Sequence, residues 1–84
     1  MKEITKKQAE RFAKKMGLRW ESVDYTIKDL TQGMNVELEH GKRNPLTNVT
    51  NDSITKTGKI ALAHLMEHPK YYVELAKMEK RLGI

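Results

Sequence analysis

Apolar residues recur every three or four positions in four stretches of the chain, which is the spacing of amphipathic helices. The first stretch covers residues 5–16, where Thr5 and Gln8 have the spacing of a capping box. Gly17 follows and is predicted to end the helix in a left-handed cap. The residues expected on its inner face are Ala9, Phe12, Ala13 and Met16.

The second helix is predicted over residues 26–41, after a connector at 18–24 that is expected to insert Trp20 into the core. Gly33 lies inside this helix and costs about 1 kcal/mol relative to alanine, so a kink or break is expected near 31–33. The apolar residues on one face of the helix are Ile27, Leu30, Met34 and Leu38.

Residues 42–51 combine turn formers with β-branched residues and show no apolar period, which predicts a long polar loop. Asp52 is the expected N-cap of a third helix that ends at His68, because the residue before Pro69 is disfavoured in helical conformation. Gly58 would allow this helix to approach a neighbour closely. The residues expected to face inward are Ile54, Ala61, Leu62 and Leu65.

The fourth helix is predicted to carry Pro69 in its first turn, where proline is well tolerated. Its expected inner face is formed by Tyr71, Leu75, Met78 and Leu82. With 84 residues the chain can build only one compact core. The predicted fold is therefore all-α: a single domain over residues 1–84, built as a small bundle of three to four helices with the long loop.

Composition narrows the functional classes. The absence of cysteine excludes disulfides and cysteine-ligated zinc. The longest apolar run, residues 60–63, is far too short to span a bilayer, so neither a membrane partner nor a targeting segment is expected and a cytoplasmic location is the default. A net charge of +5 favours polyanions or acidic proteins as partners.

The positive charge is concentrated near the N-terminus. Residues 1–20 contain seven basic and two acidic side chains, whereas residues 21–41 contain one and five. On a helical wheel, four cations fall within one arc opposite the apolar face, and we call them the basic ridge: Lys7, Arg11, Lys14 and Lys15. An ordinary solvated helix face and a membrane-surface helix are the alternatives to a phosphate-contacting surface.

Further candidate contacts to nucleic acid lie outside the first helix. One group, the C-terminal strip, comprises Lys70, Lys77 and Arg81, and the loop adds Lys42 and Arg43. Tyr71 and Tyr72 lie about 100° apart on a helix, so one of them could be exposed for base stacking, although a position in the core or at its rim is the alternative. No spacing indicates a helix-turn-helix, zinc finger or RNA-recognition fold, which makes reading of duplex DNA the weaker option.

The histidines provide the only metal-like pattern. His64 and His68 have the i, i+4 spacing of a two-imidazole site, but Leu65 stands where a zinc hydrolase needs glutamate. The alternative is that His64 contacts a carboxylate such as Glu39 and that His68 serves at the helix end. No Ser, His and Asp set indicates a nucleophilic site. We therefore expect no enzyme activity, no metal and no cofactor.

Three segments, GMNVELEHG (33–41), NVTND (48–52) and TGKIALAHL (57–65), continue into PKYY (69–72). Together they resemble a small uncharacterised domain family of bacteriophages and bacteria, over about residues 18–80. The resemblance implies a phage or bacterial cytoplasmic protein and no catalytic residue. Members of that family often carry a bulky apolar residue where this chain has His68. The basic ridge is expected to lie largely outside the shared motif, so that the motif determines the fold and the ridge determines what this chain binds.

These observations lead to two hypotheses. The first is a small, basic, non-enzymatic nucleic-acid-binding protein that prefers RNA or single strands to duplex DNA and acts on host processes, in the host cytoplasm if phage-encoded. The alternative is a module that docks on a host protein through the ridge or through the acidic segment around Glu37 and Glu39.

Overall fold

The computed structural model describes residues 3–43 and 53–83, except for the side chains of Lys42 and Arg43. The described residues contain four α-helices, one 3-10 turn and no strand, so the all-α prediction is confirmed. The elements are α1 (Lys6–Lys15), η1 (Trp20–Ser22), α2 (Ile27–Arg43), α3 (Ile54–Glu67) and α4 (Tyr71–Leu82).

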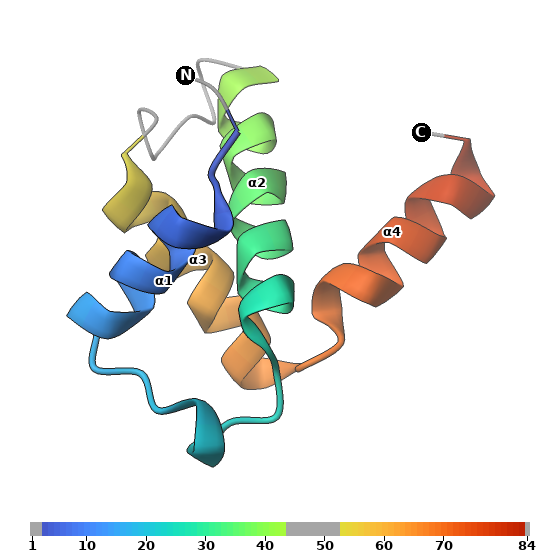
Figure 1. Cartoon of the computed structure of the whole chain (residues 1–84). Helices are drawn as coiled ribbons and strands as arrows, with labels where there is room; N and C mark the ends of the chain where they lie inside the picture. The colour runs from blue at the N-terminus through green and yellow to red at the C-terminus, as the bar shows by residue number, and fades with distance from the viewer. Residues whose placement is uncertain (1–2, 44–52, 84) are drawn as a thin grey trace.

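Helix α2 is the centre of the arrangement, because it contacts each of the other three helices (Figure 1). Helices α1 and α3 also contact each other, so α1, α2 and α3 form a three-helix unit. Helix α4 packs on α2 and α3 near its beginning and then runs away from them. Among the described elements, α1 and α4 make no contact.

The three-helix unit encloses most of a small apolar core. Leu30 and Met34 of α2 are completely buried, as is Ala61 of α3. Burying a leucine side chain stabilises the folded state by about 1.5–3 kcal/mol. The complete set of buried apolar residues is Ile4, Ala9, Phe12, Ala13, Tyr25, Leu30, Met34, Leu38, Ala61, Leu65 and Tyr72.

Helix α1 begins and ends as its sequence predicts. The Gln8 backbone N–H donates to the Thr5 hydroxyl at 3.1 Å, and the Thr5 N–H donates to the Gln8 side-chain oxygen at 2.8 Å, which completes the capping box. Gly17 ends the helix with a φ of 74°, which glycine adopts without a side-chain clash. The expected inward position of Met16 is wrong: the helix has ended there, and Met16 is 41% exposed.

The connector between α1 and α2 does not place a plug in the core. Trp20 lies in the short turn η1, is half-buried, and packs edge-on against Tyr25, with the ring centroids 6.3 Å apart. Tyr25 is the aromatic residue that is buried here. Trp20 therefore packs against the edge of the core and does not enter it.

Helix α2 is continuous, so the predicted break near Gly33 is wrong, and the helix runs two residues beyond its predicted end at Gly41. Gly33 is buried because the Tyr72 ring of α4 packs against it. A Cβ added at Gly33 would lie 2.4 Å from Cε2 of Tyr72. The glycine thus serves the close approach of another helix rather than a kink. The predicted loop at 42–51 lies outside the described residues, apart from its first two, whose backbone continues α2.

A side-chain amide ties the N-terminal segment to α2. Asn35 accepts a hydrogen bond from the Ile4 N–H at 2.7 Å and donates one to the Ile4 carbonyl at 2.9 Å. It also donates to the Thr31 carbonyl at 3.1 Å. These bonds hold Ile4 over the core, where the residue is only 3% exposed.

Helix α3 is capped by Ser53, whose hydroxyl accepts from the Lys56 N–H at 3.2 Å. The predicted cap, Asp52, lies outside the described residues and one position too early. Gly58 makes the expected close approach, since a Cβ there would lie 2.6 Å from the Phe12 ring of α1. The helix ends before His68, as predicted.

Helix α4 buries a different face from the one expected. Tyr72 is 2% exposed and occupies the core position that periodicity assigned to Tyr71, which is half-buried. Met78 and Leu82, predicted to face inward, are 39% and 62% exposed. The reason is that α4 leaves the three-helix unit after its first turns, so only its beginning has a neighbour to pack against.

Candidate nucleic-acid interface

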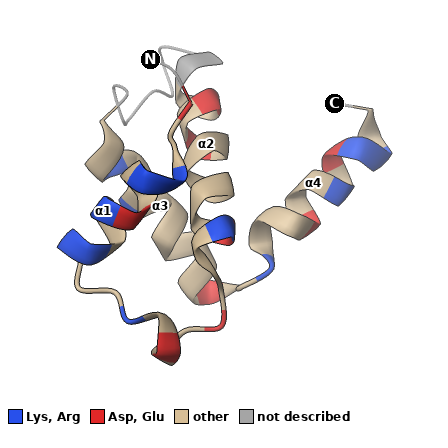
Figure 2. Cartoon of the chain, viewed as in Figure 1, with Lys and Arg blue, Asp and Glu red and all other residues tan. Residues whose placement is uncertain are grey.

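The basic ridge lies along α1, whose basic positions are coloured blue in Figure 2. All four of its side chains are exposed, while Ala9, Phe12 and Ala13 on the opposite face are buried against α2 and α3. A helix advances 100° per residue, so positions spaced by three and four residues share one side. The four cations thus lie on a helix that the structure contains, at positions that are exposed there.

The ridge cations have no acidic partner among the described residues. The ion pairs among the described residues join Arg19 to Glu21 at 2.9 Å, Lys77 to Glu74 at 3.6 Å, and His64 to Glu37 at 3.8 Å. All three lie away from the ridge. Its charges therefore face solvent and would attract a polyanion without first separating from a carboxylate.

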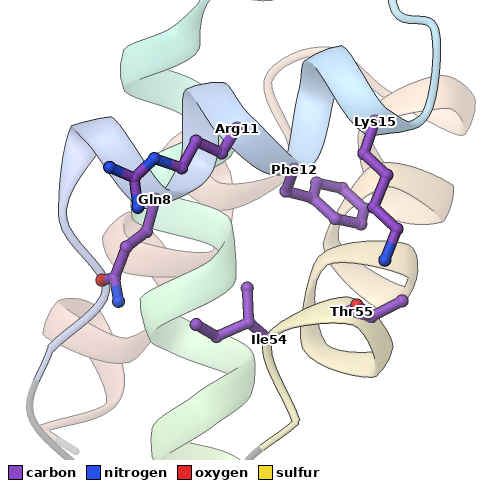
Figure 3. A pocket seen from close by; sticks show the side chains of 6 residues that line it. All are labelled: Gln8, Arg11, Phe12, Lys15, Ile54 and Thr55. Atoms are coloured by element: carbon purple, nitrogen blue, oxygen red, sulfur yellow. The ribbon is translucent and has the colours of Figure 1, made fainter.

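A cleft of about 230 Å³ opens beside the ridge, between α1 and the first turn of α3 (Figure 3). Arg11 and Lys15 belong to both the ridge and the cleft. Figure 3 shows Arg11 beside Gln8 at one end and Lys15 above Thr55 at the other. The lining residues are Gln8, Arg11, Phe12, Lys15, Ile54 and Thr55. Sequence reasoning missed the two α3 residues because they are remote from α1 along the chain.

The remaining predicted contact residues do not join the ridge. Lys70, Lys77 and Arg81 of the C-terminal strip are exposed, but they lie on or next to α4, which does not touch α1. Figure 2 shows the basic positions of α4 and those of α1 on separate helices. The side chains of Lys42 and Arg43 lie outside the described part of the chain. The predicted set thus divides into two described surfaces.

The tyrosines offer little surface for base stacking. Tyr72 is buried, and Tyr71 is half-buried and stacked on the His64 ring, with centroids 4.3 Å apart and planes 4° from parallel. One face of Tyr71 is therefore already occupied. This is the rim position that the sequence left open as the alternative.

A polar cluster joins α2, α3 and α4 beneath this aromatic stack. The Tyr72 hydroxyl donates a 2.9 Å hydrogen bond to Glu37, and the His64 imidazole lies 3.8 Å from the same carboxylate oxygen. Burial raises the pKa of the Tyr72 hydroxyl, and the negative charge of Glu37 raises it further. The carboxylate beside His64 is therefore Glu37, not the expected Glu39.

The two histidines do not converge on a common site. His64 stacks on Tyr71, whereas His68 caps the end of α3 and accepts a hydrogen bond from the Lys70 N–H at its Nδ1, at 3.2 Å. The role of His68 at the helix end is thus confirmed. Within residues 3–43 and 53–83, no group of three or more His, Asp or Glu residues could hold a metal ion.

Residues 9–81 match the model of a protein family described as "Protein of unknown function (DUF5661)". The chain belongs to this family. The match confirms the resemblance to an uncharacterised domain family, and it begins earlier than the expected residue 18, so it includes most of α1. Neither the curated proteins nor the solved structures contain a match to the chain. Over the described residues, no helix combines the length and apolarity needed to cross a membrane.

Proposed function

We propose that this protein binds nucleic acid, with RNA or single strands preferred to duplex DNA, and that it does so through the basic ridge without catalysing a reaction. The observation that carries the proposal is the exposure of four cations on one face of α1, with no carboxylate of the described residues paired to them. We expect it to act in the cytoplasm, in that of the host if the chain is encoded by a phage.

The physical basis is the release of counterions. Each phosphate that a lysine or arginine neutralises releases condensed cations from the nucleic acid, and this release favours binding most at low salt. The ridge side chains approach a strand along the length of α1, a helix of ten residues. Four phosphates is therefore the natural number of contacts for the ridge alone.

The test is the affinity of labelled RNA, single-stranded DNA and duplex DNA, measured by fluorescence anisotropy at low salt. A variant with all four ridge residues changed to glutamine should lose at least about tenfold in affinity for single strands. The matched control changes the C-terminal strip and Lys80 to glutamine, which removes the same charge from α4. A comparable loss in both variants would show that net charge, not the ridge, determines binding.

A second candidate function is docking on a protein, which one observation supports. An acidic cleft of about 390 Å³ lies between α2 and α4 and includes Glu3, Glu39 and Glu79. Glu37 was expected to share this role, but its carboxylate accepts the hydrogen bond of the Tyr72 hydroxyl. The Glu37 side chain is only 13% exposed. Docking would be supported by a partner protein that is recovered from nuclease-treated lysate and is lost when Glu39 and Glu79 are changed to glutamine. Loss of every co-purifying protein on nuclease treatment would reject docking.

A further inference from the structure

We infer that the cleft between α1 and α3 receives one unpaired base of a bound single strand. The inference rests on the proposed function and adds to it a site for the base, with the ridge holding the phosphates. The cleft lies directly against the ridge, since Arg11 and Lys15 line it. A strand that follows the ridge therefore passes its opening.

The bottom of the cleft is apolar and closely packed. The Phe12 ring is 4% exposed and is held against Gly58, where a Cβ would lie 2.6 Å from its Cζ atom. Ile54 faces it from the first turn of α3, as Figure 3 shows. A flat, weakly hydrated base gains from contact with such a surface, whereas a phosphate or a free cation does not.

The capping box of α1 orients a donor at one end of the cleft. The side-chain oxygen of Gln8 accepts the Thr5 N–H at 2.8 Å, so the amide group is fixed in place. The amide nitrogen forms no hydrogen bond with another described residue. As a donor it matches a carbonyl on a base edge, and thymine and uracil each carry two such carbonyls.

The two cations are placed to hold phosphates on either side of that base. Arg11 and Lys15 are four residues apart on α1, which puts their Cβ atoms about 5–6 Å apart. Figure 3 shows their side chains at opposite ends of the cleft with Phe12 between them. A strand whose base enters the cleft would thus meet one cation on each side of that base.

This arrangement selects for unpaired nucleic acid. A base inside a duplex is stacked and paired, so it cannot enter a cleft without first being extruded, at a cost of a few kcal/mol. A single strand has no such cost, because its bases are already free to turn outward. The charge of the ridge and the apolar cleft beside it therefore complement a strand better than a duplex.

The test compares oligothymidylate with an abasic strand of equal length and equal phosphate number, by fluorescence anisotropy on the full chain. We expect the strand with bases to bind at least about fivefold more tightly, the lower end of what one contacted base contributes. Equal affinity for both strands would overturn the base site while leaving the ridge proposal intact. Failure of both strands to bind would overturn the proposed function. Free thymidine monophosphate binding as tightly as the strand would also reject this inference, because the phosphates along the ridge would then add nothing to the affinity.

Variants locate the effect in the cleft. Gln8→Glu keeps an acceptor for the capping box but replaces the amide donor, and Ile54→Ala removes the apolar wall. Both should reduce the ratio of the two affinities towards one. Lys14→Gln is the control, because Lys14 belongs to the ridge but does not line the cleft; it should weaken both strands equally and keep the ratio. An unchanged ratio in Gln8→Glu and Ile54→Ala, with folding confirmed by circular dichroism, would contradict the inference.

Discussion

Replacing Gly33 by alanine tests why α2 carries a glycine at its centre. The added Cβ would lie 2.4 Å from Cε2, 2.8 Å from Cδ2 and 2.9 Å from Cζ of Tyr72. The ring cannot move aside freely, because it is 2% exposed and its hydroxyl is bonded to Glu37. The substitution therefore forces either α4 or the ring away from α2.

Two effects of opposite sign determine the outcome. Alanine favours a helix over glycine by about 1 kcal/mol. Overpacking a filled site costs about 1–3 kcal/mol. Complete expulsion of the ring would lose about 1.5–3 kcal/mol of burial and a charge-assisted hydrogen bond of similar value. Because three atoms of one confined ring are too close, we expect the clash to prevail, with a net loss of up to about 2 kcal/mol.

The assay is thermal and urea unfolding of Gly33→Ala, followed by circular dichroism. For a domain of this size, each kcal/mol lost lowers the Tm by about 4–8 °C. In a Tyr72→Ala background the clash is absent, so the same substitution should stabilise the chain by up to about 1 kcal/mol. This reversal of sign is the critical result. A Gly33→Ala chain more stable than the parent would refute the reasoning.

Three further predictions concern the core and its edges. Gly58→Ala should lower the free energy of unfolding by up to about 2 kcal/mol, because overlap of its Cβ with the Phe12 ring costs about 1–3 kcal/mol and the helix preference of alanine offsets about 1; urea unfolding measures this. Stability should fall above about pH 10, because the raised pKa of Tyr72 lets the folded chain keep a proton that the unfolded chain loses; Tyr72→Phe should reduce this dependence. Asn35→Ala should expose the Ile4 amide, with faster hydrogen exchange there and a loss of about 1–3 kcal/mol.

Each of these predictions has a result that would contradict it. A stable Gly58→Ala chain would mean that α1 and α3 can separate without cost. A Tyr72→Phe chain with an unchanged alkaline limb would assign the pH dependence to other groups. Protection of the Ile4 amide in Asn35→Ala would show that the side-chain amide is not what holds the N-terminal segment.

Local signals in the sequence predicted most of the helical organisation. The Thr5 and Gln8 pair, the cap at Gly17 and the stop before Pro69 each act within a few residues, so they can be read without knowledge of the tertiary structure. The pairing of remote residues could not be read in this way. Gly33 looked like a break because its reason, the Tyr72 ring, lies on another helix.

The candidate interface also has a part that the sequence predicts and a part that depends on contacts between remote residues. The ridge was predictable because its members lie on one helix whose apolar face is clear. The cleft was not, because Ile54 and Thr55 approach α1 only after α3 has folded against it. Periodicity alone also misjudged α4, since Met78 and Leu82 have the spacing of an inner face but no helix among the described elements covers them.

The salt dependence of single-strand binding is the most direct measurement of the central claim, that the ridge binds phosphates. For four contacts, log affinity should fall against log salt with a slope of about −3. The ridge variant should show a slope close to zero, whereas the variant of the C-terminal strip with Lys80 should keep most of it. A flat response of the parent chain, or an unchanged slope in the ridge variant, would contradict the claim.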